Sequence, residues 1–358
     1  MGANKTLKGH KLLIATPWEV VPGFLDTLKA EFPDLEVVSH KIAWALKPAV
    51  LGDDVFEDVT ILLTFNTLPT PAQAPKLEYV QLMSAGANHI LKDPLFTDTD
   101  VAFCTANGVH GPQISEWILA TYLAFEHQIP QYLEKQKQAR WERDNTLLED
   151  AVSKTVGILG YGSIGRQTAR VATALGMKVH AYTLHARPTP ESRRDLSWAP
   201  DGLGDPDGVF PSKWFSGSST EDLHAFLGSG LDLLVIATPL TDNTRHLIAA
   251  AEFRVLAAQG KGKTYVSNIA RGPVVSTDDI IDALNQGLIR GAALDVTDPE
   301  PLPDGHVLWS TKNVIITPHV SGGSTSYNTR VLSILEHNLR RFSEGQELTN
   351  KVNRKEGY

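Results

Sequence analysis

The chain has 358 residues, a length that allows two domains with separate hydrophobic cores. Its formal net charge of −8 argues against a nucleic-acid partner, because phosphate contacts need a dense basic face. No apolar run approaches the roughly 20 residues that a membrane-spanning helix needs, so we expect no membrane partner.

Short apolar runs recur through the first third of the chain, and amphipathic or turn-rich segments separate them. This alternation is typical of parallel strands joined by helices, with both faces of the sheet covered. The sequence therefore predicts an α/β domain. The runs lie at residues 12–15, 35–38, 59–63, 79–83 and 101–104.

A long helical pattern follows Gly111 and Pro112 and continues to about residue 143, and we interpret it as the link to a second domain. Six further apolar runs predict a doubly wound, Rossmann-type parallel sheet. Helical spacing over residues 324–342 predicts a last helix that packs back on the first domain. The six runs lie at residues 155–159, 178–182, 233–237, 264–268, 291–296 and 314–317.

The only cysteine, Cys104, lies in an apolar run and is expected to be a buried structural thiol. One cysteine allows no internal disulfide, and no secretory signal is visible, so we expect a cytoplasmic protein. Met1, Gly2 and Thr6 match the minimal myristoylation pattern, but we expect an unmodified amino terminus.

Residues 184–220 are rich in proline, glycine, serine and charge, and they contain Trp198, Trp214 and Phe215. A loop this long inside a compact domain is often functional. We favour the alternative, a solvated insertion that packs its own aromatic side chains.

A GxGxxG motif stands between a predicted strand and a predicted helix. Gly160 permits the tight turn, Gly162 lacks the Cβ that would block a pyrophosphate, and Gly165 lets the helix pack on the strand. Backbone amides at the helix amino terminus would then bind the pyrophosphate. We expect a dinucleotide to contact the whole motif, Gly160, Tyr161, Gly162, Ser163, Ile164 and Gly165.

The second strand of this predicted domain ends at Thr183, with none of the acidic residues that bind the ribose hydroxyls of NAD. The missing carboxylate removes a charge that would repel a 2′-phosphate, and Arg187 follows, as do His185, Arg193 and Arg194. We therefore prefer NADP over NAD as the coenzyme. The alternative is that these arginines only keep a loop soluble.

Three candidate catalytic residues each come just after a predicted strand of the second domain. A guanidinium at Arg271 could hold a substrate carboxylate, and His319 could protonate a carbonyl oxygen. A carboxylate at Glu300 would fix the imidazole tautomer and stabilise the imidazolium. No metal site is expected.

These segments, together with Thr238, Pro239 and Asp295, occur in the order found in the D-isomer-specific 2-hydroxyacid dehydrogenase family, which the chain resembles over nearly its whole length. The resemblance implies an NAD(P)-dependent enzyme that reduces a 2-keto acid to a D-2-hydroxy acid, similar to glyoxylate and hydroxypyruvate reductases. It implies a flavodoxin-like substrate domain (residues 1–116 and 322–358), a coenzyme domain (residues 117–321), an active site between them, and a homodimer.

By position, the resemblance makes Arg271 the substrate-binding arginine, Glu300 the acid partner and His319 the proton donor. It makes Asp295 the residue that holds the nicotinamide carboxamide, and it places Thr238 and Pro239 at the coenzyme.

Ala85, Gly86 and Ala87 form a small-residue turn after a predicted strand, and their backbone amides could bind the substrate carboxylate as the similar family loop does. An ordinary tight turn is the alternative. Many relatives have an aspartate where this chain has Asn88. We expect this difference to affect how the loop is held in place more than the chemistry. The sequence leaves open whether the substrate is a small 2-keto acid or an aromatic one. The residues that could line the pocket for the substrate side chain are Trp44, Phe65, Asn66, His110 and Trp117.

Two other functions remain open. Formate dehydrogenase is similar, but it uses glutamine where this chain has Glu300, which favours keto-acid reduction. Some relatives are NAD-binding corepressors that keep the three catalytic residues, but the acidic chain shows no nuclear basic cluster.

Overall fold

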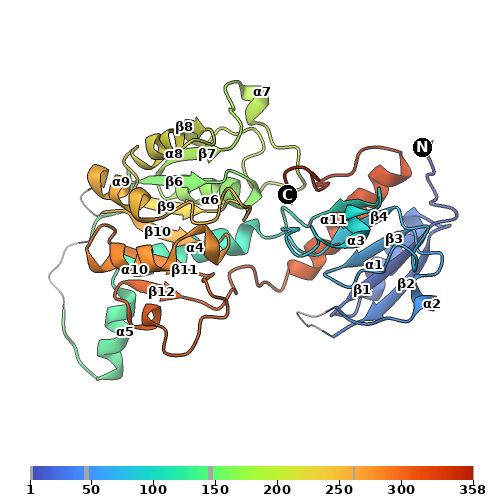
Figure 1. Cartoon of the computed structure of the whole chain (residues 1–358), viewed down its shortest axis with the longest axis horizontal. Coiled ribbons are helices and arrows are strands. Elements are labelled where there is room, and N and C mark those ends of the chain that lie inside the picture. The colour runs from blue at the N-terminus through green and yellow to red at the C-terminus, as the bar shows by residue number, and fades with distance from the viewer. Residues whose placement is uncertain (1–2, 44–47, 144–147, 261–262, 358) are drawn as a thin grey trace. The chain divides into compact units, whose positions relative to one another are not determined.

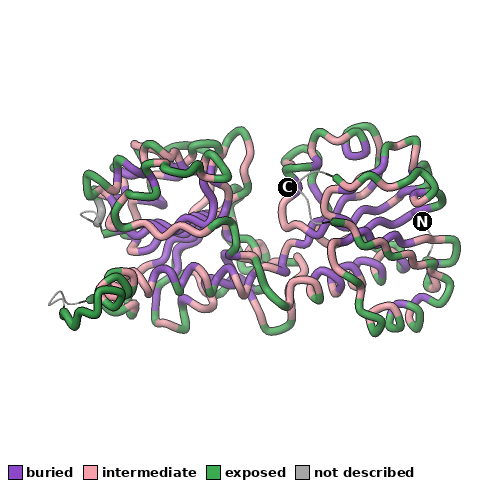
Figure 2. The backbone as a smooth tube through the Cα atoms, turned by 90° about the horizontal axis from the view of Figure 1, so that it is seen from below, coloured by how far each residue is buried: buried purple, intermediate pink, exposed green. Residues whose placement is uncertain are grey.

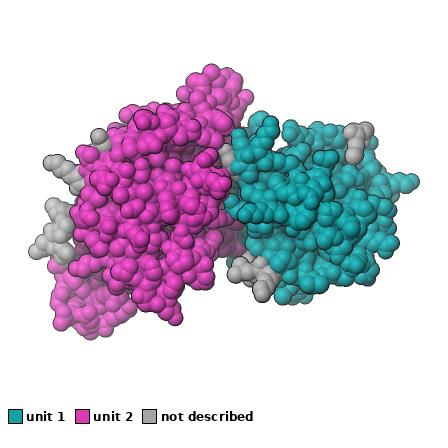
Figure 3. Space-filling view, in the orientation of Figure 1, with its two compact units in different colours: residues 1–109, 196–200, 325–358 teal, residues 110–195, 201–324 magenta. Residues whose placement is uncertain are grey.

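A computed structural model describes residues 3–43, 48–143, 148–260 and 263–357. Contacts between its residues divide the chain into two compact units, drawn in different colours in Figure 3. Unit 1 comprises residues 1–109, 196–200 and 325–358, and unit 2 comprises residues 110–195 and 201–324. The domain limits inferred from the sequence, after residues 116 and 321, remain a proposal.

Unit 1 is built on a parallel sheet with the strand order β2-β1-β3-β4-β5 (Figure 1). This is the flavodoxin-like order. The expected α/β fold is therefore confirmed for this unit. The strands are β1 (Lys11–Thr16), β2 (Glu36–Lys41), β3 (Ile61–Thr64), β4 (Tyr79–Leu82) and β5 (Ala102–Cys104).

Alternate residues of these strands enter two separate cores. Leu12 and Ile14 join a cluster with the helices α1 (Pro22–Glu31) and α11 (Tyr327–Ser343). Leu13 and Ala15 join a cluster with α2 (Asp53–Phe56) and α3 (Pro94–Thr97). The sheet is thus covered on both faces, as the near-continuous apolar runs require. The carboxyl-terminal helix α11 packs on unit 1.

Unit 2 holds a second parallel sheet, with the order β12-β11-β10-β9-β6-β7-β8. Strand order reverses between β6 and β9, which makes the carboxyl end of β6 the switch point where ligands of such sheets bind. The Rossmann-type prediction is confirmed. The strands are β6 (Thr155–Leu159), β7 (Lys178–Thr183), β8 (Pro211–Ser216), β9 (Leu233–Ile236), β10 (Tyr265–Asn268), β11 (Gly291–Leu294) and β12 (Val314–Ile316).

Helices α4 (Gly111–Glu126) and α6 (Ser163–Ala174) share one apolar cluster with this sheet, and α8 (Thr220–Leu227), α9 (Ala250–Gly260) and α10 (Thr277–Asn285) share another. Figure 2 shows the buried strands between more exposed outer segments. The short elements are α5 (Ile129–Lys137), α7 (Pro190–Arg193), η1 (Gly272–Val274) and η2 (Val307–Ser310).

The expectation that residues 184–220 pack their own aromatic side chains is wrong. Trp214 and Phe215 lie on the unpredicted strand β8 and pack against the two cores of unit 2. Trp198 packs against a core of unit 1. The abundance of proline, glycine and serine hid a six-residue edge strand.

Cys104 is fully buried, and burial raises the pKa of its thiol to about 12, so it is a structural residue and no nucleophile. Within the described ranges, no helix combines the length and apolarity required to cross a bilayer. Met1, Gly2 and Trp44 lie outside the described residues.

Candidate functional site

The three predicted catalytic residues follow neighbouring strands of unit 2. Arg271 comes after β10, Glu300 after β11 and His319 after β12. These strands are adjacent and parallel, so their carboxyl ends meet at one edge of the sheet.

A direct hydrogen bond joins two of the three. His319 Nδ1 and Glu300 Oε1 are 2.7 Å apart, and the two side chains are 48% and 40% exposed. With a carboxylate as acceptor, Nδ1 carries the proton that it donates, which fixes the ring orientation and leaves Nε2 as the reactive nitrogen. The pair is therefore arranged as a proton donor with an anionic partner.

Arg271 is linked to the same carboxylate by charge. Burial lowers the pKa of the Arg271 guanidinium, and the Glu300 charge raises it. Asn268 fixes the turn before Arg271: its Nδ2 donates to the Arg271 carbonyl at 3.2 Å, and its Oδ1 accepts from the Ala270 amide at 3.1 Å. Glu300 thus interacts with both Arg271 and His319.

The segments that carry Arg271 and Glu300 pack directly on each other. A Cβ on Gly272 would overlap the Thr297 carbonyl, so only glycine allows this approach. The Thr277 hydroxyl donates to the Asp298 carbonyl at 2.7 Å, and the peptide bonds before Pro299 and Pro301 are cis. These contacts hold Glu300 beside the Arg271 turn.

Asp295 braces the turn on which His319 lies, a role that sequence reasoning missed. Its side chain, in a residue only 2% exposed, accepts hydrogen bonds from the Thr317 hydroxyl, the Val320 amide and the amide and hydroxyl of Ser321. Its carbonyl accepts from the His319 amide at 2.8 Å. In the sequence, only the order of the motifs along the chain could have indicated that Asp295 holds this turn.

The glycine loop, residues 160–165, has the geometry that a pyrophosphate site needs. Gly160 has a φ of +101°, and a Cβ there would come within 2.7 Å of Ala237. A Cβ on Gly165 would come within 2.5 Å of the Gly160 carbonyl oxygen, whereas one on Gly162 would meet nothing within 4 Å. Open space therefore lies beside Gly162, at the amino terminus of the twelve-residue helix α6, where backbone amides favour an anion.

Other proposed coenzyme residues follow β9 or end β7. The Thr238 amide would lie 2.8 Å from a Cβ on Gly160, so the turn after β9 adjoins the glycine loop, and the Pro239 carbonyl accepts from Thr244 Oγ1 at 2.7 Å. Thr183 ends β7, and its hydroxyl donates to the His185 carbonyl at 2.8 Å.

The arginines after β7 also support the local fold. Arg187 donates to the Ser192 carbonyl at 2.6 Å, and Arg193 donates to the Arg187 carbonyl at 3.0 Å while stacking over the Trp214 ring. Arg194 pairs with Asp207 at 3.3 Å. The interpretation that these arginines only keep the loop soluble is therefore incomplete.

The proposed substrate loop lies in unit 1, after β4. The Ser84 hydroxyl donates to the Gly86 carbonyl at 2.8 Å within the turn that contains Ala85 and Ala87. Nearby, the His89 and Phe65 rings stack at 5.0 Å. Of the other pocket candidates, Trp117 packs against a core of unit 2.

Comparison with known proteins decides the family. Residues 119–201 and 214–321 match the family model described as "D-isomer specific 2-hydroxyacid dehydrogenase, NAD binding domain". The chain belongs to this dehydrogenase family. The predicted resemblance is confirmed.

Relatives of known name agree with this family. The chain is 30% identical to a glyoxylate reductase of Aeropyrum pernix, over 79% of this chain and 78% of that protein. It is 27% identical to a solved structure of a D-isomer specific 2-hydroxyacid dehydrogenase from Xanthobacter autotrophicus Py2 in complex with NADPH and MES, with a TM-score of 0.74 and coverage of 98% and 99%. A solved NADPH-dependent glyoxylate/hydroxypyruvate reductase from Sinorhizobium meliloti, in complex with NADP and sulfate, is also 27% identical, with a TM-score of 0.72 and coverage of 98% and 100%.

As a member of the D-isomer specific 2-hydroxyacid dehydrogenase family, the protein is an oxidoreductase that uses NAD or NADP and acts between 2-keto and 2-hydroxy acids. These findings favour the reductase over the formate dehydrogenase and corepressor alternatives. Among the described residues, no group of three or more histidine, cysteine or acidic side chains is placed to hold a metal ion.

Proposed function

We propose that the protein reduces a small 2-keto acid of the glyoxylate or hydroxypyruvate class to the D-2-hydroxy acid, with NADPH as the preferred coenzyme. The observation that carries this proposal is the His319–Glu300 hydrogen bond, with Arg271 in electrostatic contact with the same carboxylate. Relatives named as glyoxylate and hydroxypyruvate reductases support the substrate class.

Each catalytic side chain has a distinct task. Arg271 binds the substrate carboxylate and orients the adjacent carbonyl group. His319 transfers the proton on Nε2 to the carbonyl oxygen while the carbonyl carbon accepts a hydride, and Glu300 stabilises the imidazolium before the transfer. When bound, the reduced nicotinamide supplies that hydride. The amides of Ala85, Gly86 and Ala87 in unit 1 complete carboxylate binding in this proposal.

For the coenzyme, the six residues of the glycine loop would bind the pyrophosphate, with Thr238 and Pro239 beside it and Thr183 and Arg187 towards the adenosine ribose. The preference for NADPH is supported by the absence of an acidic residue at the end of β7 and by the two relatives solved with NADPH or NADP. Asp295 was expected to hold the nicotinamide carboxamide, and its contacts now favour a supporting role at His319.

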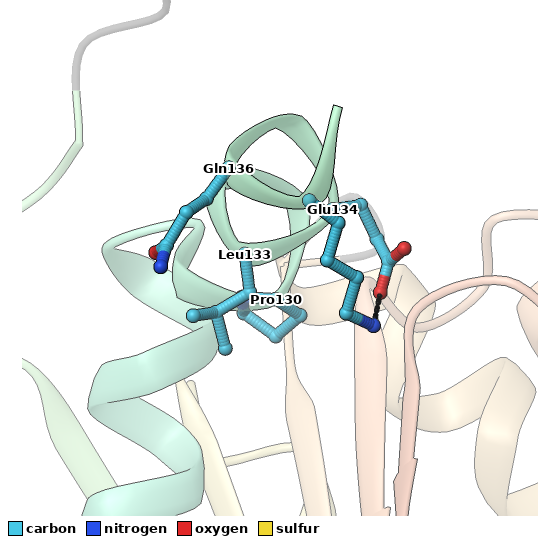
Figure 4. A pocket seen from close by; sticks show the side chains of 5 residues that line it. Pro130, Leu133, Glu134 and Gln136 are labelled. Atoms are coloured by element: carbon cyan, nitrogen blue, oxygen red, sulfur yellow. Dashed lines mark hydrogen bonds and ion pairs between the residues drawn. The ribbon is translucent and has the colours of Figure 1, made fainter. Parts of the chain in front are cut away.

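We also propose a homodimer formed through α5. Its surface pocket is lined by Pro130, Leu133, Glu134, Gln136 and Lys137, and Figure 4 shows Pro130 and Leu133 side by side on this helix. Leu133 is 49% exposed, and the nearby Trp141 is fully exposed. Apolar side chains beside an acidic and a basic residue suit a self-complementary two-fold contact. A Leu133→Asp variant should sediment as a monomer, whereas an unchanged mass would contradict this surface.

The location proposed for the protein is the cytoplasm, which suits its single buried thiol and its coenzyme.

The decisive experiment is a panel of 2-keto acids incubated with NADPH or NADH and followed at the nicotinamide absorbance. We expect oxidation with small 2-keto acids and a lower KM for NADPH than for NADH. Arg271→Gln should raise the KM for the acid by about 10-fold or more, because a charged hydrogen-bonding pair is lost. No oxidation with any acid would contradict the activity, and a far lower KM for NADH would contradict the coenzyme preference.

A further inference from the structure

One segment of unit 2 lies outside the match to the family model and packs on the helix that follows the glycine loop. The model matches residues 119–201 and 214–321, so residues 202–213 fall between the two stretches. Residues 204–210, here called the 204–210 segment, belong to unit 2, as do the glycine loop and α6. All contacts between this segment and the loop therefore lie within a single unit.

The 204–210 segment is fixed on α6 at both of its ends. The Gly204 amide donates to Gln167 Oε1 at 2.6 Å, and the Gly204 carbonyl accepts from Arg170 Nε at 2.7 Å. Gly204 has a φ of 65°, in the left-handed region that favours glycine. The Arg170 guanidinium also lies 5.4 Å from the centre of the Phe210 ring. Gln167 and Arg170 are three positions apart on α6, so one face of the helix holds the segment.

Asp205 is buried at the contact between the segment and the glycine loop. It is only 1% exposed, and its carboxylate accepts from the amides of Val209 and Phe210 at 2.9 and 3.2 Å. The hydroxyl of Tyr161 donates to the same carboxylate at 2.7 Å. Burial of a carboxylate is costly unless its oxygens are hydrogen-bonded. Three donors meet that need, and one of them comes from the second residue of the glycine loop.

The side chain of Tyr161 is held by several partners at once. It is 4% exposed, its ring packs edge-on against Trp214 with ring centres 5.1 Å apart, and the Arg166 guanidinium lies 5.1 Å from its centre. Burial and the Asp205 charge raise the pKa of the phenol, so the hydroxyl keeps its proton and donates it. Because Tyr161 lies between the first two glycines of the loop, a fixed ring also restricts the backbone on either side.

A buried guanidinium joins the segment to the first turn of α6. Arg166, only 4% exposed, donates to the Asp205 carbonyl and to the Arg193 carbonyl, the latter at 2.8 Å. Its Nε lies 3.1 Å from an Asp195 carboxylate oxygen, which supplies the opposite charge that a buried cation needs. Its amide donates to the Gly162 carbonyl at 2.9 Å. The segment is therefore linked to the turn where the pyrophosphate is proposed to bind.

We propose that the 204–210 segment holds the glycine loop in its pyrophosphate-binding conformation before the coenzyme binds, with Asp205 and Tyr161 as positioning residues. The glycines give the loop many conformations, and fixing one of them costs entropy. A loop that is already fixed avoids this cost at binding, because the apparent dissociation constant rises as the fraction of competent molecules falls. The pyrophosphate is common to NADPH and NADH, so both should benefit equally. This proposal rests on the proposed function, since it takes the glycine loop as the coenzyme site.

The first test needs no coenzyme. Tyr161→Phe keeps the ring and removes only the hydroxyl, so the chain should still fold. Hydrogen exchange at the hydrogen-bonded amides of Gly160 and Arg166 should be faster than in the native protein by about threefold or more. Tyr327→Phe is the matched control, because it removes a phenol hydrogen bond of unit 1, to the Met83 carbonyl at 2.5 Å, and should leave these amides unchanged. Native-like exchange in Tyr161→Phe would overturn the proposal.

The second test measures coenzyme affinity by titration. In Tyr161→Phe and in Asp205→Asn, the dissociation constants of NADPH and NADH should both rise by about 3- to 10-fold, with their ratio constant within about twofold. The double variant should bind no more weakly than Asp205→Asn alone, because both changes break one interaction. A loss confined to NADPH, or two losses that simply add, would overturn the proposal.

Steady-state kinetics separates positioning of the loop from a general loss of structure. In Tyr161→Phe the KM for NADPH should rise, while kcat and the KM for the keto acid stay within about twofold of the native values. A lower melting temperature with unchanged coenzyme affinity would show a purely structural role and refute the proposal. Native protein that bound neither coenzyme would contradict the proposed function, whereas the exchange comparison would still decide whether the segment holds the loop.

Discussion

The carboxylate of Asp295 accepts hydrogen bonds from both the amide and the hydroxyl of Ser321, at 3.0 and 2.5 Å. Thr317 and Val320 donate to the same carboxylate, so four donors around His319 converge on one buried anion. His319 itself has a φ of 54°, in the left-handed region that costs a side-chain-bearing residue free energy. The bonds to Asp295 offset this cost and keep His319 directed at Glu300.

Asp295→Asn should therefore reduce both stability and turnover. One acceptor oxygen becomes an NH₂ group facing other donors, which should lower the free energy of unfolding by about 1–3 kcal/mol. We expect kcat to fall while the NADPH dissociation constant stays nearly constant, measured by urea unfolding, steady-state kinetics and titration. Asp304→Asn, at an exposed position, is the control. If turnover at saturating NADPH is normal and only coenzyme affinity is lost, Asp295 acts on the coenzyme instead.

His319→Gln should depress keto-acid reduction by about 10²–10⁴-fold, because the proton donor is lost while the side-chain size is kept. The measurement is kcat with NADPH and the best keto acid of the panel. His224→Gln removes a different histidine–carboxylate pair, that with Glu252, and should keep near-native turnover. Native-like turnover in His319→Gln would refute the assignment of the proton donor.

The sequence predicted both sheets because most of their strands are buried and read as apolar runs. It missed β8, whose exposed edge position permits the polar residues Ser212 and Lys213. It also missed the hydrogen bonds that Asp295 accepts around His319 and the hydrogen bond between Tyr161 and Asp205. Both depend on contacts between residues more than 20 positions apart, such as Asp295–Thr317 and Tyr161–Asp205, which no local pattern encodes.

The three candidate catalytic residues could be placed together from the sequence for a different reason. Arg271, Glu300 and His319 each follow an apolar strand, so the parallel topology alone brings them to one edge of the sheet. The approach of Gly272 to Thr297, which sets how closely two of these segments pack, could only be seen in three dimensions.

Gly162→Ala should separate coenzyme binding from stability. An added Cβ meets nothing within 4 Å, so the melting temperature should change by no more than about 2 °C, but the methyl group would occupy the space proposed for the pyrophosphate. NADPH affinity should fall by about 10-fold or more, measured by calorimetric titration. Gly165→Ala is the informative contrast, because its Cβ would come within 2.5 Å of the Gly160 carbonyl oxygen and should destabilise the fold. Unaltered affinity in Gly162→Ala would place the coenzyme elsewhere.

His180 should make the protein less stable in mild acid. It lies on β7, is 5% exposed and hydrogen-bonds Ser229, and burial, aided by Lys213 and Lys178, lowers the pKa of its imidazole to about 4. The unfolded chain binds this proton near pH 6.5 and the folded one only near pH 4. The free energy of unfolding contributed by the neutral ring is therefore complete above about pH 6.5 and is lost as the pH falls towards 4.

His180→Gln removes this titration, so between pH 7.5 and 4.5 it should lose less stability than the native protein, by on the order of 1 kcal/mol. Urea unfolding at both pH values gives the difference, in which all other titrating groups cancel. The exposed His127→Gln variant should follow the native protein. Equal losses in the native protein and His180→Gln would mean that His180 is protonated in the folded state as readily as in the unfolded chain, against the burial observed for its ring.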